Sequence, residues 1–541
     1  MKALEKKPER RYQSAAELRE QLKKLGLKGR KRVSDRARLL LATAVLGLAL
    51  AAYAAWKLWR PAADAPGRET TLAVLPFQVI TAPAEIGYLG VGIPDAIITR
   101  LANLTLIRLR PTSAILRYEG RNVDLKQAGE ELQTEHLLTG TVQKVEERFR
   151  VTVQLVRVKD EAPLWGERYD LERQDLLSLQ DSIAEKVTAA LELRMTDGGG
   201  ERARYTNNPD AYDSFLRGRV HLVRHTKEGD LAAVSAFENT LRLDPNFAAA
   251  RAGLAMAAAD MHLRFASGPE VQIWGERAKA QARAALGLDS HLAESHLALA
   301  AVYGKTEFDW EQTIEESRRS LELNGSLDLA HYFLSRAFYH LGLLELAASE
   351  VRKGLELKGQ EQLEPLRLRA LFALLEGRYS EAVPLLEELR RLSDLPMGDS
   401  YLGMAYYYSG QRERGEATLE EQTRSSSAAG AARARSTLAS FLAARGERRR
   451  ARELVEAVTS GSYMDHHVAY SLGAAQAQLG QPAEAVRWLR KATDSGFPCY
   501  PWYARDPLLK PLAADSEFQR LLGDLRDSLE RARARYARVG A

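Results

Sequence analysis

The chain has 541 residues, of which 45% are hydrophobic and 28% charged, a composition typical of folded protein and enough chain for several domains. The net charge of +5 comes from residues 1–38, which hold 14 Lys and Arg against 5 Asp and Glu, whereas the remainder holds 63 against 67. This distribution argues against a nucleic-acid-binding surface in the remainder, and the lone Cys499 excludes an internal disulfide and a Cys-based zinc site.

Residues 1–25 predict a short amphipathic helix, because Ser14 and Glu17 form a capping box and Gly26 can end the helix. The string KALEKKPERRYQSAAELREQL resembles the end of the C-lobe in bacterial eukaryotic-like serine/threonine protein kinases. In that family Arg11 would be a structural residue that pairs with a Glu elsewhere in the lobe. A chance basic helix is the alternative.

The rest of a kinase is missing, since the sequence has no Gly-rich phosphate loop, H-R-D-type catalytic loop or D-F-G motif. We therefore expect no enzyme activity and no cofactor. The chain as given resembles a kinase that has been cut just before its last helix, and its gene could begin upstream of Met1. If the chain does start at Met1, we expect a disordered N-terminus.

Residues 26–38 form a basic juxtamembrane segment, and residues 39–59 predict a transmembrane helix. Residues 39–56 are eighteen apolar residues without a charge, about 27 Å of helix, which is close to the thickness of a bilayer's hydrocarbon core. Eight Lys and Arg precede this stretch and three follow it, which predicts a cytoplasmic N-terminus and extracytoplasmic C-terminal domains in the inner membrane. A cleavable signal peptide is less favoured because its charged leader would be 38 residues long.

After a Pro/Ala linker at 60–70, residues 71–195 predict one α/β domain. The expected strands are 72–77, 106–109, 137–145 and 148–158, with the last two forming a hairpin, and the expected helices are 93–104, 124–132 and 175–193. The strings LAVLPF, YLGVGIPDAIITRLA and LLTGTVQKVEERFRVTVQLVRV resemble the TolB-N-terminal/FlgO-like domain. In bacteria that domain often follows a kinase, winged-helix or cyclase domain and precedes tetratricopeptide repeats. The resemblance carries no catalytic residue.

A second linker spans 196–209, and residues 210–495 predict about eight tetratricopeptide repeats. Glycines recur at intervals of 33 to 36 residues, at Gly342, Gly377, Gly410, Gly446 and Gly480. A small residue follows five positions after each, namely Ala347, Ala382, Gly415, Ala451 and Ala485. Small residues let the two helices of a unit approach closely. Residues 496–541 form a C-terminal segment, in which the helix 516–538 is expected to cap the solenoid.

The repeats predict a peptide-binding groove on their concave surface. Positions ten, six and three before each turn glycine share one helix face, which in this fold lines that surface. These positions give the candidate residues Tyr332, Arg336, Tyr339, Arg367, Met404, Tyr407 and Tyr470. Aromatic residues, Met and Arg suit a peptide-binding lining, but packing between adjacent units is an equally good interpretation.

Three short motifs resemble known sites but lack residues that those sites require. Residues 304–306 read Gly-Lys-Thr but lack the first glycine of a P-loop, and Gly87, Gly90 and Gly92 do not have dinucleotide-binding spacing. His221 and His225 lie four residues apart without a third ligand, so no metal site is expected.

The sequence thus predicts a mainly α protein, an α-solenoid of tetratricopeptide repeats preceded by a smaller α/β domain and one transmembrane helix. The first functional hypothesis is a membrane-anchored scaffold or sensor that binds proteins or peptides and resembles the non-catalytic half of a receptor-like serine/threonine kinase. The second is that the full gene product is that kinase and this chain is truncated. The third is a repeat-bearing partner of an envelope complex.

Overall fold

The computed structural model describes residues 19–20, 70–81, 83–102, 107–191, 206–224, 226–358, 363–392, 398–425, 428–461 and 463–536. Residues Glu69–Ala541 form one compact unit. The predicted kinase-like helix, apart from Arg19 and Glu20, and the predicted transmembrane helix 39–59 lie outside the described residues. Among the helices that are described, none combines the length and the apolar character that a membrane span requires.

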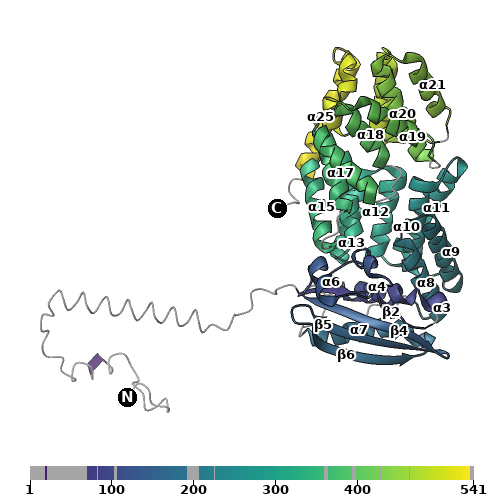
Figure 1. Ribbon diagram of the computed structural model, residues 1–541, viewed down its shortest axis with the longest axis vertical. Helices are drawn as coiled ribbons and strands as arrows, with labels where there is room; N and C mark the ends of the chain where they lie inside the picture. The colour runs from purple at the N-terminus through teal and green to yellow at the C-terminus, as the bar shows by residue number, and fades with distance from the viewer. Residues whose placement is uncertain are drawn as a thin grey trace. The chain divides into compact units, whose positions relative to one another are not determined.

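The α/β part of the unit is built on one sheet (Figure 1). Its strands are β1 (Thr70–Val74), β2 (Gln78–Val79), β3 (Ile107–Leu109), β4 (His136–Val145), β5 (Arg148–Arg157) and β6 (Ala162–Leu171). Its helices are α3 (Pro83–Ile86), α4 (Leu89–Leu101), α5 (Thr112–Ile115), α6 (Leu125–Leu132) and α7 (Leu176–Ala190). The strand order is β3-β1-β4-β5-β6, with β2 also on β4; β1 runs parallel to β3 and β4, and β4 to β6 are antiparallel.

Successive side chains of β1 point to opposite faces of the sheet, and both sets are apolar, which explains why helices cover both faces. Leu72 and Val74 pack into one core with α4 and α7, whereas Ala73 and Leu75 pack into another with α5 and α6. The predicted strand 72–77 ends early, at Val74, two residues before Pro76, which cannot donate to a ladder. The β4–β5 hairpin was predicted, but β6 was not, because it alternates only between exposed and half-buried residues.

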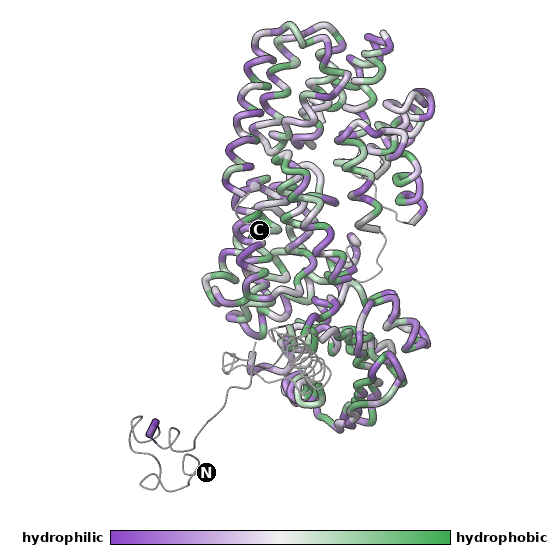
Figure 2. Tube along the Cα trace, turned by 90° about the vertical axis from the view of Figure 1, so that its left-hand side faces the viewer, coloured by the Kyte–Doolittle hydropathy of each residue, from purple (hydrophilic) through white to green (hydrophobic). Residues whose placement is uncertain are grey.

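Within the described part of the chain, sixteen helices that follow the α/β part, α8 to α23, form eight successive hairpins. They are α8 (Pro209–Leu222), α9 (Lys227–Leu243), α10 (Ala248–Asp260), α11 (Pro269–Leu288), α12 (Ala293–Val302), α13 (Trp310–Leu323), α14 (Asp328–His340), α15 (Leu344–Lys358), α16 (Leu363–Leu375), α17 (Tyr379–Leu392), α18 (Gly398–Tyr408), α19 (Arg412–Gln422), α20 (Ala428–Arg445), α21 (Arg448–Thr459), α22 (His466–Gln478) and α23 (Pro482–Asp494). Apolar and polar residues alternate along these helices (Figure 2), as amphipathic packing requires.

The glycine period marks the turns of the last five hairpins. All five turn glycines have a positive φ, between +75° and +93°, a conformation that costs glycine little. The small residues lie where the paired helices touch: a Cβ on Gly403 of α18 would lie 3.3 Å from the Gly415 carbonyl oxygen of α19. Ala485 is fully buried against α22 in the same way. The predicted repeat register is therefore confirmed.

The C-terminal segment does more than cap the last repeat. It contains α24 (Tyr500–Arg505), the 3-10 turn η7 (Pro507–Leu512) and α25 (Ser516–Tyr536). It packs on α23 and also on earlier repeats, since the Trp310 indole donates to the Gly496 carbonyl (2.6 Å) and the Tyr536 ring lies edge-on to Phe338 (5.7 Å). Helix α25 is drawn in yellow in Figure 1.

An ion pair between a buried Asp95 and a half-buried Arg219 joins the α/β part to the first repeat. Asp95 of α4 accepts two hydrogen bonds from Arg219 of α8, at 2.8 and 3.0 Å, and a third from Thr112, at 2.6 Å. Around it, one hydrophobic core continues from the sheet into the first repeats. The two parts therefore form one folded unit.

Candidate functional site

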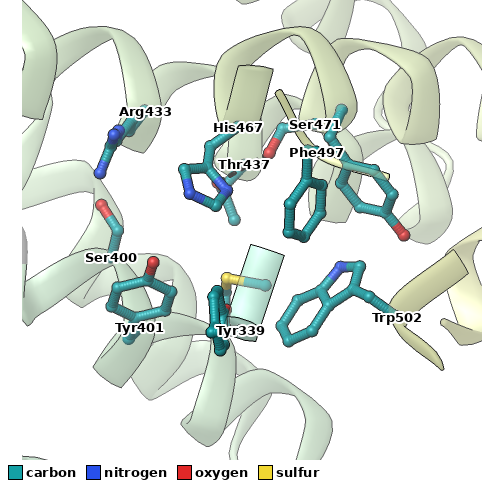
Figure 3. Close-up of a pocket in the computed structure, with 11 residues that line it drawn as sticks. Tyr339, Ser400, Tyr401, Arg433, Thr437, His467, Ser471, Phe497 and Trp502 are labelled. Atoms are coloured by element: carbon teal, nitrogen blue, oxygen red, sulfur yellow. Dashed lines mark hydrogen bonds between the residues drawn. The ribbon is translucent and has the colours of Figure 1, made fainter. Parts of the chain in front are cut away.

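The inner helices of the later repeats surround a small cavity of about 40 Å³. Figure 3 shows its lining, which comes from α14, α18, α20 and α22 and from the C-terminal segment. The lining residues are Tyr339, Ser400, Tyr401, Met404, Arg433, Thr437, His467, Tyr470, Ser471, Phe497 and Trp502. All four helices are the first helix of their hairpin, the helix that faces the inside of a solenoid of this kind.

Equivalent repeat positions supply seven of the eleven lining residues, since Ser400 and Tyr470 also share a position, ten residues before the turn glycine. Tyr401, Thr437 and Ser471 each stand nine residues before the turn glycine of their unit. Arg433 and His467 each stand thirteen residues before theirs. These residues form a continuous face across the sixth, seventh and eighth repeats, and Tyr339 of the fourth repeat and the C-terminal segment complete the pocket.

A buried ion pair fixes the polar end of the pocket. Nε of Arg433 donates to Asp465 at 2.9 Å, and the Tyr463 hydroxyl donates to the same carboxylate, also at 2.9 Å. The other oxygen of Asp465 accepts from the Val468 amide at 2.8 Å and so caps α22. Although burial favours the neutral acid, the Arg433 guanidinium holds the pKa of Asp465 at about 2. The pair orients Arg433 and fixes the start of α22.

A second buried carboxylate anchors the aromatic wall. Asp506 accepts from the hydroxyls of Tyr408 (2.8 Å) and Tyr470 (2.7 Å), and burial raises its pKa. These bonds hold the C-terminal segment against α18 and α22. Next to them, the Trp502 indole N–H is buried and has no acceptor among the described residues. It is a free donor in the wall of the pocket.

Three of the seven predicted groove residues meet in this pocket, namely Tyr339, Met404 and Tyr470. Tyr339 and Tyr470 are also buried members of the core that the later repeats share. Tyr407 faces elsewhere, since its ring stacks on Phe441 at 3.6 Å.

The other three predicted residues lie outside the pocket lining. The Arg367 guanidinium lies over the Tyr332 ring, 5.4 Å from its centroid. The guanidinium of Arg336 lies over the Trp310 ring at 5.7 Å. Both contacts join helices of two different repeats, so these three residues take part in packing between repeats. Their role in binding a partner stays a prediction.

Sequence reasoning missed Arg433, His467 and the whole C-terminal wall. Arg433 and His467 could have been found. They stand thirteen residues before their turn glycines, three residues before the first of the predicted groove positions, and so lie on the same helix face. Phe497 and Trp502 gave no such signal, since they follow the last repeat and have no equivalent in the others.

The motifs that were set aside have structural explanations. Lys305 is buried in the π-helical turn η6 (Tyr303–Glu307), and its ammonium pairs with Asp260 at 2.8 Å. A Cβ on Gly90 would lie 2.8 Å from the Phe77 carbonyl oxygen, so this glycine permits close packing. His221 lies on α8 with its pKa lowered by burial, and His225 lies outside the described residues.

Comparison with known proteins gives partial matches. Residues 68–186 match the family model of the second domain of HilA/YgeH-like transcriptional regulators. A putative adenylate cyclase 3 of Rhizobium meliloti (strain 1021) is 30% identical over 190 residues, which are 35% of this chain. The chain spans about a third, 32%, of the length of that relative.

Among solved structures, a tetratricopeptide repeat protein from Parabacteroides merdae covers 59% of this chain and 99% of its own length, with 12% identity and a TM-score of 0.29. The match to yeast Tom70 covers 61% of this chain and 66% of the length of the Tom70 chain, with 14% identity and a TM-score of 0.32. The chain's own hairpins, turn glycines and small contact residues make residues 209–494 an array of tetratricopeptide-like repeats. This fold supports a role as a protein–protein interaction scaffold.

Proposed function

We propose that this chain binds a protein or peptide partner in the pocket on the inner face of its repeats. The observation that carries the proposal is the lining itself, in which aromatic residues, a methionine and an arginine from four repeats meet the C-terminal segment and its Trp502 N–H, which has no acceptor among the described residues. Aromatic residues, Met and Arg are enriched at protein interfaces, and an unpaired buried donor favours a ligand that brings an acceptor. A backbone carbonyl of an extended peptide is such an acceptor.

Partner recovery from pocket variants tests this proposal. Tyr401→Ala and Trp502→Ala remove half-buried side chains from opposite walls and should each reduce recovery of the partner at least about tenfold, as hot-spot truncation does. Ile273→Ala is the matched control, since this residue is 63% exposed on α11, far outside the lining. Full recovery by both folded pocket variants would remove the pocket from the proposal.

We further propose that the chain is anchored in the inner membrane by residues 39–59, with its N-terminus in the cytoplasm. The support is the uncharged apolar run and the excess of Lys and Arg before it. Alkaline phosphatase fused after Gly200 should then be active. Activity only in fusions placed before Leu39 would reverse the topology.

Residues 2–25 support the proposal that the chain is the non-catalytic half of a receptor-like serine/threonine kinase. The TolB-N-terminal/FlgO-like resemblance supports the same proposal, because that domain is found behind kinase, winged-helix and cyclase domains. The matches to a transcriptional regulator and a putative adenylate cyclase fit this pattern of a regulatory segment shared by several signalling proteins.

The chain itself is proposed to transfer no phosphate, because it lacks the residues that hold Mg²⁺-ATP in kinases. Purified chain incubated with labelled ATP and a general kinase substrate should give no labelled product. Labelling above that of a heat-denatured sample would contradict this part of the proposal. Reading the DNA upstream of Met1 in the same frame tests the kinase link, which predicts a D-F-G triplet there.

A further inference from the structure

Three histidines from distant parts of the repeat array meet beside the pocket. His340 ends α14, and His466 and His467 begin α22, 126 residues further along the chain. One nitrogen of each ring lies within 4.8 Å of the corresponding nitrogens of the other two. His340 and His466 are buried, with 4% and 0% of their surface exposed.

Three ring nitrogens of this cluster lack, within the described residues, the hydrogen bonds that buried polar groups normally make. Both nitrogens of His466 are buried without a partner among the described residues, and so is Nε2 of His340. The other nitrogen of His340, Nδ1, pairs at 2.7 Å with the Arg336 carbonyl oxygen, which can only accept. That bond puts the proton on Nδ1 and the free lone pair on Nε2, the tautomer that a metal ligand needs.

Burial also affects the imidazoles of this cluster. Burial lowers the pKa of His340 and His467 well below the usual value, and it lowers the pKa of His466 to about 3. The charge of Asp465 and the nearby Ser495 carbonyl act in the opposite direction and raise the pKa of His466 in part. The Ser495 carbonyl does not make a hydrogen bond to the ring.

Aromatic rings enclose the cluster and hold it in place. Trp310 stacks on His340 with 4.1 Å between ring centroids, Phe308 lies edge-on to His466 at 4.5 Å, and Phe497 lies 4.8 Å from His467. Such an apolar shell limits the access of water and orients ligands. His467 also lines the pocket, so a ligand in the pocket can reach the cluster through it.

We propose that His340, His466 and His467 form a binding site for a divalent transition metal ion of the zinc class. Three imidazoles leave the fourth position of a tetrahedral site for another ligand. Ligand nitrogens in a tetrahedral zinc site lie about 3.3 Å apart, so the rings must move inward by about 1 Å. The bound ion would link the fourth repeat to the eighth.

The surrounding charges narrow the choice of ion. The guanidinium groups of Arg336 and Arg433 lie close enough to lower the pKa of His466 and so oppose a cation, while Asp465 offsets them in part. A set of imidazole ligands favours ions such as Zn²⁺ or Cu²⁺ over Mg²⁺ and Ca²⁺, which prefer oxygen ligands. The same positive surroundings favour an anion at the fourth position.

Metal titration of the untagged full chain tests the site. After treatment with chelator and desalting, the chain should bind one Co²⁺ with the visible absorption of a tetrahedral complex, and Zn²⁺ should displace it. Zn²⁺ alone should also raise the melting temperature measured by circular dichroism. Absence of stoichiometric binding to the folded chain would overturn the proposal.

Two variants and a control make the assignment specific. His340→Gln removes a buried ligand and His467→Gln a half-buried one, and each should weaken binding more than about 100-fold, beyond the loss seen when outer-shell partners are removed. His291→Gln, at an exposed histidine, should bind as the unchanged chain does. If His340→Gln fails to fold, His467→Gln decides the question. Unchanged affinity in a folded ligand variant would mean that the metal binds elsewhere.

Discussion

Replacing Arg433 with Met should strongly destabilise the later repeats. The side chains of Arg433 and Asp465 are 10% and 2% exposed, so the substitution leaves a carboxylate buried without its counter-charge. Breaking a buried pair in this way costs about 3–5 kcal/mol in the free energy of unfolding. Asp465 keeps its bonds to the Val468 amide and the Tyr463 hydroxyl, which places the expected loss near the lower end of that range.

The pH dependence gives this prediction its sign. In the unchanged chain the pKa of Asp465 falls from 3.8 to about 2, so its contribution of about 2 kcal/mol is present above pH 4 and is lost as the pH falls through 2. In Arg433→Met the lowering effect of the guanidinium is gone, so burial should raise the pKa of Asp465 above 3.8. The folded state of the variant is then less stable at a pH where Asp465 is ionised than at a pH where it is protonated. The difference between variant and unchanged chain should therefore shrink as the pH is lowered from 7 to 4.

Urea unfolding followed by circular dichroism measures this difference, with midpoints compared at each pH because an array of repeats need not unfold in two states. The double variant Arg433→Met/Asp465→Asn should recover much of the loss, since Asn removes the charge and still caps α22. Arg449→Met is the matched control, at a side chain that is 94% exposed. A loss below about 1 kcal/mol, or a gap that does not narrow in acid, would refute the reasoning.

Two further substitutions test the repeat contact and the junction of the two parts. Ala485→Trp should overpack the α22–α23 contact and cost about 1–3 kcal/mol, seen as a lower melting temperature, while Ala483→Trp on the exposed side of the same helix should not. Asp95→Asn should weaken the two charge-assisted bonds from Arg219 and cost about 1.5–3 kcal/mol by urea unfolding. The control Asp160→Asn, at an exposed residue, should leave the urea midpoint unchanged. Equal shifts of the midpoint in Asp95→Asn and Asp160→Asn would mean that the loss does not come from the junction.

The repeat array could be predicted because its signals are local. A turn glycine needs a positive φ, and a small residue is needed wherever two helices touch, so both recur with the period of the fold, as at Gly480 and Ala485. The β4–β5 hairpin could also be predicted from the sequence, because apolar and polar residues alternate along its strands. Strand β6 was not, since neither of its faces is fully buried.

The candidate pocket depends on contacts that no local pattern encodes. Its aromatic wall comes from Phe497 and Trp502, which reach it only because the C-terminal segment folds back along the inner helices. The histidine cluster likewise joins His340 to His466 across 126 residues. Pairings over such distances follow from the curvature of the whole array.

The central claim, that a partner occupies the inner pocket, is tested most directly by photo-crosslinking in cells. A photoreactive residue in place of half-buried Met404 lines the pocket, and one in place of Ile273 lies on exposed α11. The account predicts a defined adduct from position 404 that disappears when Trp502→Ala is added, and no such adduct from position 273. No adduct from position 404, or one that persists undiminished in folded Trp502→Ala, would contradict it.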